Sequence, residues 1–245
     1  MPFPLEMCFP RRQGVWPVLL FSGLSVLPLE LQACDGPRDV READLATIQA
    51  FVRDSGRSVL TFVGYSGAGY EDAAAMLQQA EVILAAEAPE ATLINIGATA
   101  EGIGAVYQLA KRRGFSTLGI VSTLARDERV ALSPCVDHVF YVPDGSWGGR
   151  LADTGVLSPT SAAIVAVSRA MVGIGGGDIA RDEMLAARAL GKPVRFFAAD
   201  LNHAQARARA RARGGGRAAG FSWIGRAGNI VFQRVVSCAS VPESR

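Results

Sequence analysis

The sequence is poor in the residues that form metal sites and disulfide frameworks. Its 245 residues include only four cysteines and two histidines. The cysteines are far apart, and their spacing matches neither a zinc-binding motif nor a small disulfide-rich domain. They are Cys8, Cys34, Cys135 and Cys238. We therefore expect no metal site and no cofactor, and we expect buried or idle thiols at these four positions.

Complete nucleotide-binding and hydrolase motifs are also missing. Neither the G-x-G-x-x-G fingerprint nor the Walker pattern is present in full. Ser66 lies in Gly64-Tyr65-Ser66-Gly67, but this stretch does not satisfy the G-x-S-x-G pattern of serine hydrolases. The sequence therefore does not indicate a serine hydrolase, and any nucleotide site must depend on less specific features.

Acidic residues are scarce near the C-terminus. Residues 204–245 contain eight arginines and one acid, Glu243, which gives this segment a charge of +7 against +2 for the whole chain and leaves −5 elsewhere. A nucleic-acid contact would have to come chiefly from this segment. The alternation of Ala and Arg over 206–213 predicts a solvated, frayed helix rather than a binding face. We predict a basic, irregular tail over 204–245 and do not expect nucleic acid as the main partner.

Long hydrophobic runs are lacking as well. The mostly apolar stretch 15–29 is too short for an ordinary membrane-spanning helix. Arg11-Arg12 precede it, and Leu31-Gln32-Ala33-Cys34 follows, which is similar to the lipobox of a bacterial lipoprotein signal. Two interpretations of residues 1–37 stay open. They form either an extension ahead of a cytoplasmic domain or an export signal whose product is anchored to a membrane at Cys34.

Between these ends, residues 38–203 show the alternating pattern of a single α/β domain. Strands are predicted over 58–63, 92–96, 116–121, 136–142, 170–174 and 194–197, and helices over 40–52, 71–86, 103–113, 159–169 and 179–190. Because strands and helices alternate, the sheet should be mostly parallel with right-handed crossovers. The predicted fold class is α/β, a Rossmann-like, doubly wound sheet in one domain with irregular tails.

Three glycine-rich turns follow predicted strands. They contain Gly64, Tyr65, Ser66 and Gly67, then Gly97, Thr99 and Gly102, and finally Gly175, Gly176, Gly177 and Asp178. In a parallel sheet these turns gather at the carboxyl edge and should share one crevice. Glycines let backbone amides approach an anion, the following helix adds its positive end, and Asp178 is predicted to cap that helix. The turns therefore predict a phosphate-binding site.

The same stretches resemble the SLOG superfamily of Rossmann-like proteins, which includes the cytokinin-activating phosphoribohydrolases and DNA-processing proteins. Residues 62–66 (Phe-Val-Gly-Tyr-Ser) are similar to the F-x-G-S-S motif, residues 94–102 to V-Y-G-G-G-x-x-G, and residues 175–183 to P-G-G-x-G-T-x-E-E. The resemblance covers about residues 59–197. It implies a nucleotide or phosphosugar bound across the turns, commonly in a homodimer.

The resemblance also implies candidate catalytic residues. Glu183 or Asp182 matches the acidic end of the last motif, whose glutamate acts beside an arginine of an R-K pair in the phosphoribohydrolases. The chain has no such pair, Arg150 is the nearest candidate, and Ala180 replaces the turn threonine. We therefore predict a nucleotide- or phosphosugar-binding sensor or carrier. The alternatives are a phosphoribohydrolase acting on a nucleoside monophosphate and a single-stranded nucleic-acid binder that uses the arginine-rich tail.

Overall fold

A computed structural model describes residues 34–213, so Cys8, Cys238, the lipobox residues before Cys34 and the tail beyond Arg213 lie outside the described residues. Its elements are β1 (Asp39–Glu42), α1 (Leu45–Asp54), β2 (Ser58–Gly64), α2 (Ala73–Leu84), β3 (Thr92–Asn95), the 3-10 turn η1 (Gly102–Gly104), α3 (Ala105–Arg112), β4 (Ser116–Ser122), α4 (Thr123–Asp127), β5 (His138–Val142), α5 (Pro159–Val167), β6 (Ser168–Ile174), α6 (Asp178–Ala189), β7 (Val194–Phe197) and α7 (His203–Arg213). Across this described range, no helix has the length and apolar character needed to cross a membrane.

The strands form one seven-stranded parallel sheet in the order β1-β5-β4-β3-β2-β6-β7. The predicted Rossmann-like α/β fold is confirmed. From β2 the chain adds β3, β4 and β5 on one side, and α5 then returns it to place β6 on the other side of β2. Sheets of this kind bind ligands at the carboxyl ends of the strands where the order reverses, which here is between β2 and β6.

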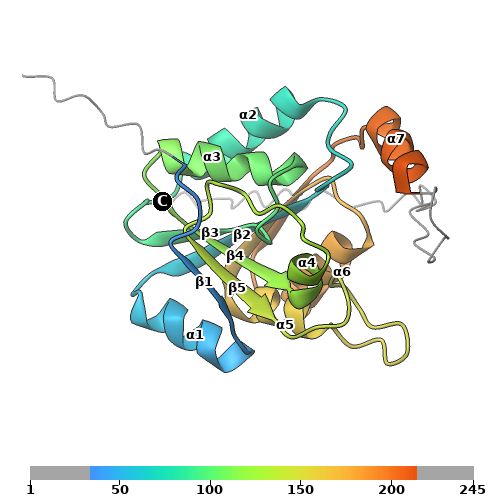
Figure 1. Cartoon of the computed structure of the whole chain (residues 1–245). Coiled ribbons are helices and arrows are strands. Elements are labelled where there is room, and N and C mark those ends of the chain that lie inside the picture. Colours follow the sequence, from blue (N-terminus) through green and yellow to red (C-terminus); the bar gives the residue numbers. More distant parts are fainter. Residues whose placement is uncertain (1–33, 214–245) are drawn as a thin grey trace, which may run out of the picture. The chain divides into compact units, whose positions relative to one another are not determined.

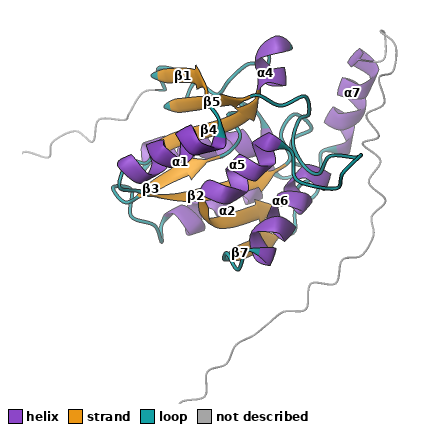
Figure 2. Cartoon of the chain, turned by 90° about the horizontal axis from the view of Figure 1, so that it is seen from below, coloured by secondary structure: helices purple, strands orange, loops and turns teal. Residues whose placement is uncertain are grey.

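Helices cover both faces of the sheet (Figures 1 and 2). Helices α2 and α3 pack on one face in a core that includes Phe62 and Tyr107, and α1, α5 and α6 pack on the other in a core that includes Phe140 and Met184. Because both faces are covered, the central strands are apolar on both sides, and five of the seven residues of β2 are buried. This packing fixes the positions of the strand ends and therefore of the turns that follow them.

The beginning of the domain differs from the prediction. A single helix over 40–52 is wrong, because Asp39–Glu42 form the edge strand β1, which pairs with β5. Helix α1 starts only after Asp44, whose side chain accepts a hydrogen bond from the N–H of Thr47 at 2.8 Å. Val40 and Ala43 have helical spacing, but residues 39–42 pair with a strand almost a hundred residues later. A local sequence pattern contains no information about such a distant partner.

Cys34 and Cys135 form a disulfide, so the prediction of idle thiols is wrong for these two cysteines. They are separated by 101 positions in the sequence, but their Cα atoms lie 4.4 Å apart. The bond ties the segment before β1 to the loop before β5. A sulfur in a disulfide cannot also carry the thioether of a lipid anchor, so an anchor at Cys34 and this disulfide exclude one another.

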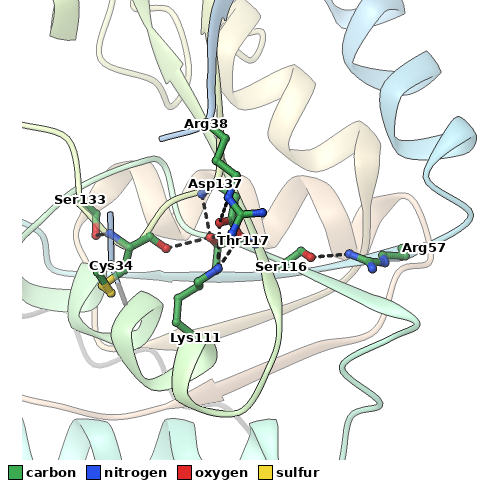
Figure 3. A network of polar contacts seen from close by, with 9 residues as sticks. Cys34, Arg38, Arg57, Lys111, Ser116, Thr117, Ser133 and Asp137 are labelled. Carbon is green, nitrogen blue, oxygen red and sulfur yellow. Dashed lines mark hydrogen bonds and ion pairs between the residues drawn. A yellow bond between two sulfur atoms is a disulfide. The ribbon is translucent and has the colours of Figure 1, made fainter. Parts of the chain in front are cut away.

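A buried polar network lies near the disulfide, at the amino ends of β4 and β5 (Figure 3). The Nζ atom of Lys111 donates to both carboxylate oxygens of Asp137, at 2.8 and 3.1 Å, and the N–H of Thr117 donates to the same carboxylate at 2.9 Å. Lys111 and Asp137 are only 5% and 7% exposed. Burial raises the pKa of Asp137, but the hydrogen bonds from Lys111 and Thr117 outweigh it and hold this pKa below its usual range. Since the glycine-rich turns lie at the opposite ends of the strands, we assign the network to the fold rather than to the site.

The described chain ends in a helix, as the alternation of Ala and Arg predicts for 206–213. Residues His203–Arg213 form α7, which contains the helix expected over 206–213 and extends the ordered chain past the boundary predicted at 203. The Oδ1 atom of Asn202 accepts a hydrogen bond from the N–H of Gln205 at 2.9 Å, which supports the first turn of α7. The helix begins three residues before the predicted start at 206, while residues 214–245 of the predicted tail lie outside the described residues.

Candidate functional site

The three glycine-rich turns meet at the carboxyl edge of the sheet. We call them the β2 turn (residues 64–69), the β3 turn (97–102) and the β6 turn (175–177). A β-carbon on Gly176 would lie 3.4 Å from the Cα of Gly64, so the β2 and β6 turns are in contact. The N–H of Ile103, just after the β3 turn, donates to the carbonyl oxygen of Tyr65 at 2.7 Å. The three turns therefore form one rim, as a parallel sheet requires.

Close packing explains glycine at two positions of the rim. A β-carbon on Gly64 would collide with the Tyr70 hydroxyl and would lie 2.7 Å from the carbonyl oxygen of Ile174. Gly176 has a φ of +121°, which L side chains rarely adopt, and a β-carbon there would lie 2.7 Å from that of Ala180. A side chain at either position would force the β2 and β6 turns apart.

Two tyrosines outside the recognised motifs hold the turns in place. The hydroxyl of Tyr70 donates to the carbonyl oxygen of Ile174 at 2.7 Å and accepts from the N–H of Tyr65 at 3.1 Å, so it joins the β2 turn to the end of β6. The hydroxyl of Tyr107 accepts from the N–H of Ala98 at 3.2 Å and supports the β3 turn. Burial raises the pKa of both phenols well above the usual value, so both stay protonated. Neither tyrosine belongs to a predicted motif, and the bond from Tyr70 to Ile174 spans 104 positions, which no local pattern contains.

The rim presents backbone amides that have no protein partner. In the part of the chain that the structure describes, no hydrogen bond is made by the N–H groups of Ser66, Gly67 and Ala68 in the β2 turn, or by those of Gly176, Gly177 and Asp178 at the start of α6. Unpaired amides in the first turn of a helix bind water or an anion, and the helix dipole favours negative charge there. The arrangement is therefore chemically suited to a phosphate group.

Asp178 does not cap α6 as predicted. The cap position is Gly177, which has no side chain to offer, and Asp178 is the first helical residue. Its carboxylate instead forms an ion pair with Arg181 at 2.8 Å. The last glycine of the turn shifts the helix start by one residue, and this shift leaves the amides at the start of α6 without a side-chain cap.

The candidate catalytic residues lie close together, but they are engaged with other parts of the protein. Glu183 is only 4% exposed, and its Oε1 accepts a hydrogen bond from Ser161 Oγ at 2.6 Å. The Asp182 carboxylate accepts from the backbone N–H of Arg150 at 3.2 Å, whereas the guanidinium of Arg150 donates to the carbonyl oxygen of Gly155 at 2.6 Å. The structure therefore joins Asp182 to the backbone rather than to the guanidinium of Arg150.

Glu183 is the most strongly perturbed carboxyl near the rim. Its burial, assisted by the neighbouring charge of Asp182, raises its pKa to about 7, although the hydrogen bond from Ser161 acts in the opposite direction. Ser161 Oγ also accepts the N–H of Gly149 at 2.7 Å, so Glu183 is linked through Ser161 to the loop after β5. Such a carboxyl carries a proton for part of the time at neutral pH, which is a property of many functional acids.

Two cavities of the described chain lie away from the rim. One, of about 300 Å³, is lined by residues that include Leu60, Arg169 and Arg195 near the amino ends of β2, β6 and β7, and the other, of about 470 Å³, lies beside α1. No residue of the three turns lines either cavity. Among the residues described, no group of three or more His, Cys, Asp and Glu side chains could hold a metal ion.

The sheet order and the helices on both faces define a Rossmann-like α/β protein. No protein-family model and no curated protein match the sequence. Similar solved structures include a Moco carrier protein from Chlamydomonas reinhardtii, at 20% identity over 58% of this chain and 76% of that chain with a TM-score of 0.43. Another structure of the molybdenum cofactor carrier protein from Chlamydomonas reinhardtii is 16% identical over 65% of this chain and 99% of that chain, with a TM-score of 0.40. The structural-genomics target TM1055 is 22% identical over 56% of this chain and 72% of that chain, also with a TM-score of 0.40. At these identities the similarity concerns the fold alone.

Proposed function

We propose that the protein binds a nucleotide or phosphosugar at the rim, in the way that the SLOG resemblance implies. The observation that carries this proposal is the set of unpaired amides at the start of α6. The β6 turn that holds them is in contact with the β2 turn, and the β2 turn has unpaired amides as well. Both turns lie where the strand order reverses, between β2 and β6. A phosphate placed there would receive hydrogen bonds from the amides of Gly176 and Gly177 and would be favoured by the helix dipole.

Binding has more support than catalysis. Cleavage of an N-glycosidic bond needs a group that assists departure of the base and a group that stabilises the developing ribosyl cation. Glu183 is closed off against Ser161, and the Arg150 guanidinium is bound to Gly155, so neither group is free for these tasks. The raised pKa of Glu183 is the one observation that favours the phosphoribohydrolase as a second candidate function.

A thermal-shift screen tests the proposed ligand class. The panel contains the common nucleoside 5′-monophosphates and ribose 5-phosphate, with the corresponding nucleosides as uncharged controls. A phosphorylated ligand at a hundred times its dissociation constant should stabilise the native state by about 2.7 kcal/mol, and the nucleosides should do so much less. The absence of any shift that depends on the phosphate would contradict the proposal.

Asp178→Asn tests whether the phosphate lies at the start of α6. The Asp178 side chain is 68% exposed and sits among the unpaired amides, so its charge should oppose a bound anion. We expect the variant to bind the monophosphate found in the screen about three- to fivefold more tightly by calorimetry. The matched control is Glu90→Gln, an exposed acid shortly before β3 at the other end of the strands, and its affinity should stay within about twofold of the wild type. Equal affinities for the Asp178 variant and the wild type would place the phosphate elsewhere.

A further inference from the structure

Helix α7 and the segment that leads into it lie against the β2 turn and the residues that follow it. The N–H of Glu71 donates to the carbonyl oxygen of Asp200 at 3.0 Å, and that of Asn202 donates to the carbonyl oxygen of Gly69 at 3.3 Å. Within α7, Gln205 Nε2 donates to the carbonyl oxygen of Gly67 at 3.0 Å. Figures 1 and 2 show α7 apart from the two helix layers that cover the sheet. The helix therefore adds little to the core, and its described contacts are with the rim.

Arg209 brings a positive charge to the β2 turn. Its guanidinium forms an ion pair with Glu101 of the β3 turn, and a β-carbon on Gly67 would lie only 2.6 Å from its Nη1 atom. Both partners are partly exposed, with 38% of the Arg209 side chain and 51% of the Glu101 side chain accessible to solvent. A solvated ligand can therefore reach the guanidinium without opening the core.

The groups around Arg209 on the β2 turn are hydrogen-bond donors. The N–H groups of Ser66, Gly67 and Ala68 are unpaired within residues 34–213, and the exposed Ser66 hydroxyl also makes no hydrogen bond there. A guanidinium beside consecutive free amides and a hydroxyl is an arrangement that recognises phosphate oxygens. Glu101 is the carboxylate that occupies the guanidinium in this structure.

We propose that Arg209 is a ligand-binding residue of the rim, which exchanges the carboxylate of Glu101 for the phosphate of the ligand. This inference rests on the proposed function. The inference gives the arginine-rich helix a role that the Ala-Arg pattern did not predict. The pattern spreads the arginines around the helix and argues against a binding face, but this role needs only one arginine, Arg209, to face the rim. Glu101 then acts as a competing anion, which weakens binding of ligands that lack a phosphate or carry only a weak charge.

The test compares three single variants of the full chain. The probes are adenosine 5′-monophosphate and ribose 5-phosphate, with adenosine as the uncharged control, and calorimetry gives the dissociation constants. Arg209→Gln should raise the constant for both phosphates about tenfold, because a charge-assisted contact is lost. Glu101→Gln should lower it about threefold, because the competing carboxylate is gone. Arg211→Gln removes the same charge from an exposed position on the same helix and should change it less than about twofold.

The outcomes separate this inference from the proposed function. If neither phosphate binds the wild-type chain, the proposed function fails. If both bind and Arg209→Gln matches Arg211→Gln, or if Glu101→Gln weakens binding, the role of Arg209 is refuted while the proposed function stands. Thermal unfolding without ligand is measured for each variant, and an unchanged midpoint shows that a loss of affinity does not come from a loss of folding.

Discussion

Replacing Lys111 with methionine is expected to destabilise the fold by about 3–5 kcal/mol, because the change removes the buried cation of the buried Asp137 carboxylate. The N–H and hydroxyl of Thr117 would still donate to that carboxylate, and Arg38 would remain 3.8 Å away. The Thr117 donors are neutral and the Arg38 side chain is 75% exposed, so they do not replace a buried cation. Urea unfolding at pH 7, followed by circular dichroism, measures the loss. Adding Asp137→Asn to the Lys111 variant should recover a large part of it, because no unpaired charge then remains.

A surface ion pair next to the same helix provides the control. Arg113, which follows the last residue of α3, pairs with Glu81, and both side chains are more than a third exposed. Arg113→Met should therefore cost less than about 1 kcal/mol. If the Lys111 and Arg113 variants lose the same stability, the buried pair does not hold the amino ends of β4 and β5 as described.

The lowered pKa of Asp137 makes the stability of the fold depend on pH. The stabilisation from the ionised Asp137 carboxylate is present above the unfolded pKa and is lost as the pH falls through the lower folded pKa, in the acid range below about 4.

The second large effect is expected from Glu183→Gln and depends on pH. The folded pKa of Glu183 is about 7, above the ordinary value of 4.5, so the native state holds a proton that the unfolded state releases. The stability that this proton provides is fully present below pH 4.5 and is lost as the pH rises to about 7. The free energy of unfolding of the wild type, relative to that of Glu183→Gln, should therefore fall by roughly 3 kcal/mol across this range.

Denaturant unfolding at several pH values measures this difference, and the comparison cancels any constant effect of the substitution itself. Curves that run parallel from pH 4 to 8 would show that Glu183 titrates as an ordinary carboxyl.

The same variant tests the second candidate function. Release of free base from a nucleoside monophosphate by the wild type, abolished in Glu183→Gln, would favour the phosphoribohydrolase. A pure binding protein shows no such release.

The sequence predicted the architecture well because the α/β alternation is a local signal with a global consequence. Each apolar strand followed by a glycine-rich turn and a helix requires a parallel neighbour, and parallel strands place their turns at the same edge. For this reason the sequence alone assigns Gly64, Gly97 and Gly175 to one rim. The position of the rim depends only on the order of the elements.

The features that the sequence did not predict depend on contacts between distant residues. Val40 lies in a strand because β5 is beside it, and Cys34 is oxidised because Cys135 is brought within reach. The Tyr70 hydroxyl belongs to the rim because it reaches the end of β6. Arg209 pairs with Glu101 because the chain after β7 returns to the rim and sets α7 beside the β2 turn, and the Ala-Arg pattern does not distinguish it from the other arginines of the helix. None of these relations has a signature within the fifteen or so residues over which periodicity is read.

An NMR titration of the protein with adenosine 5′-monophosphate tests most directly whether the rim is the binding site. Saturable shifts of the backbone amides are expected at Ser66, Gly67 and Gly176 to Asp178, with little change near the cavity lined by Arg169 and Arg195. Shifts that centre on that cavity, or the absence of saturable shifts with this nucleotide and with ribose 5-phosphate, would contradict a phosphate site at the carboxyl edge of the sheet.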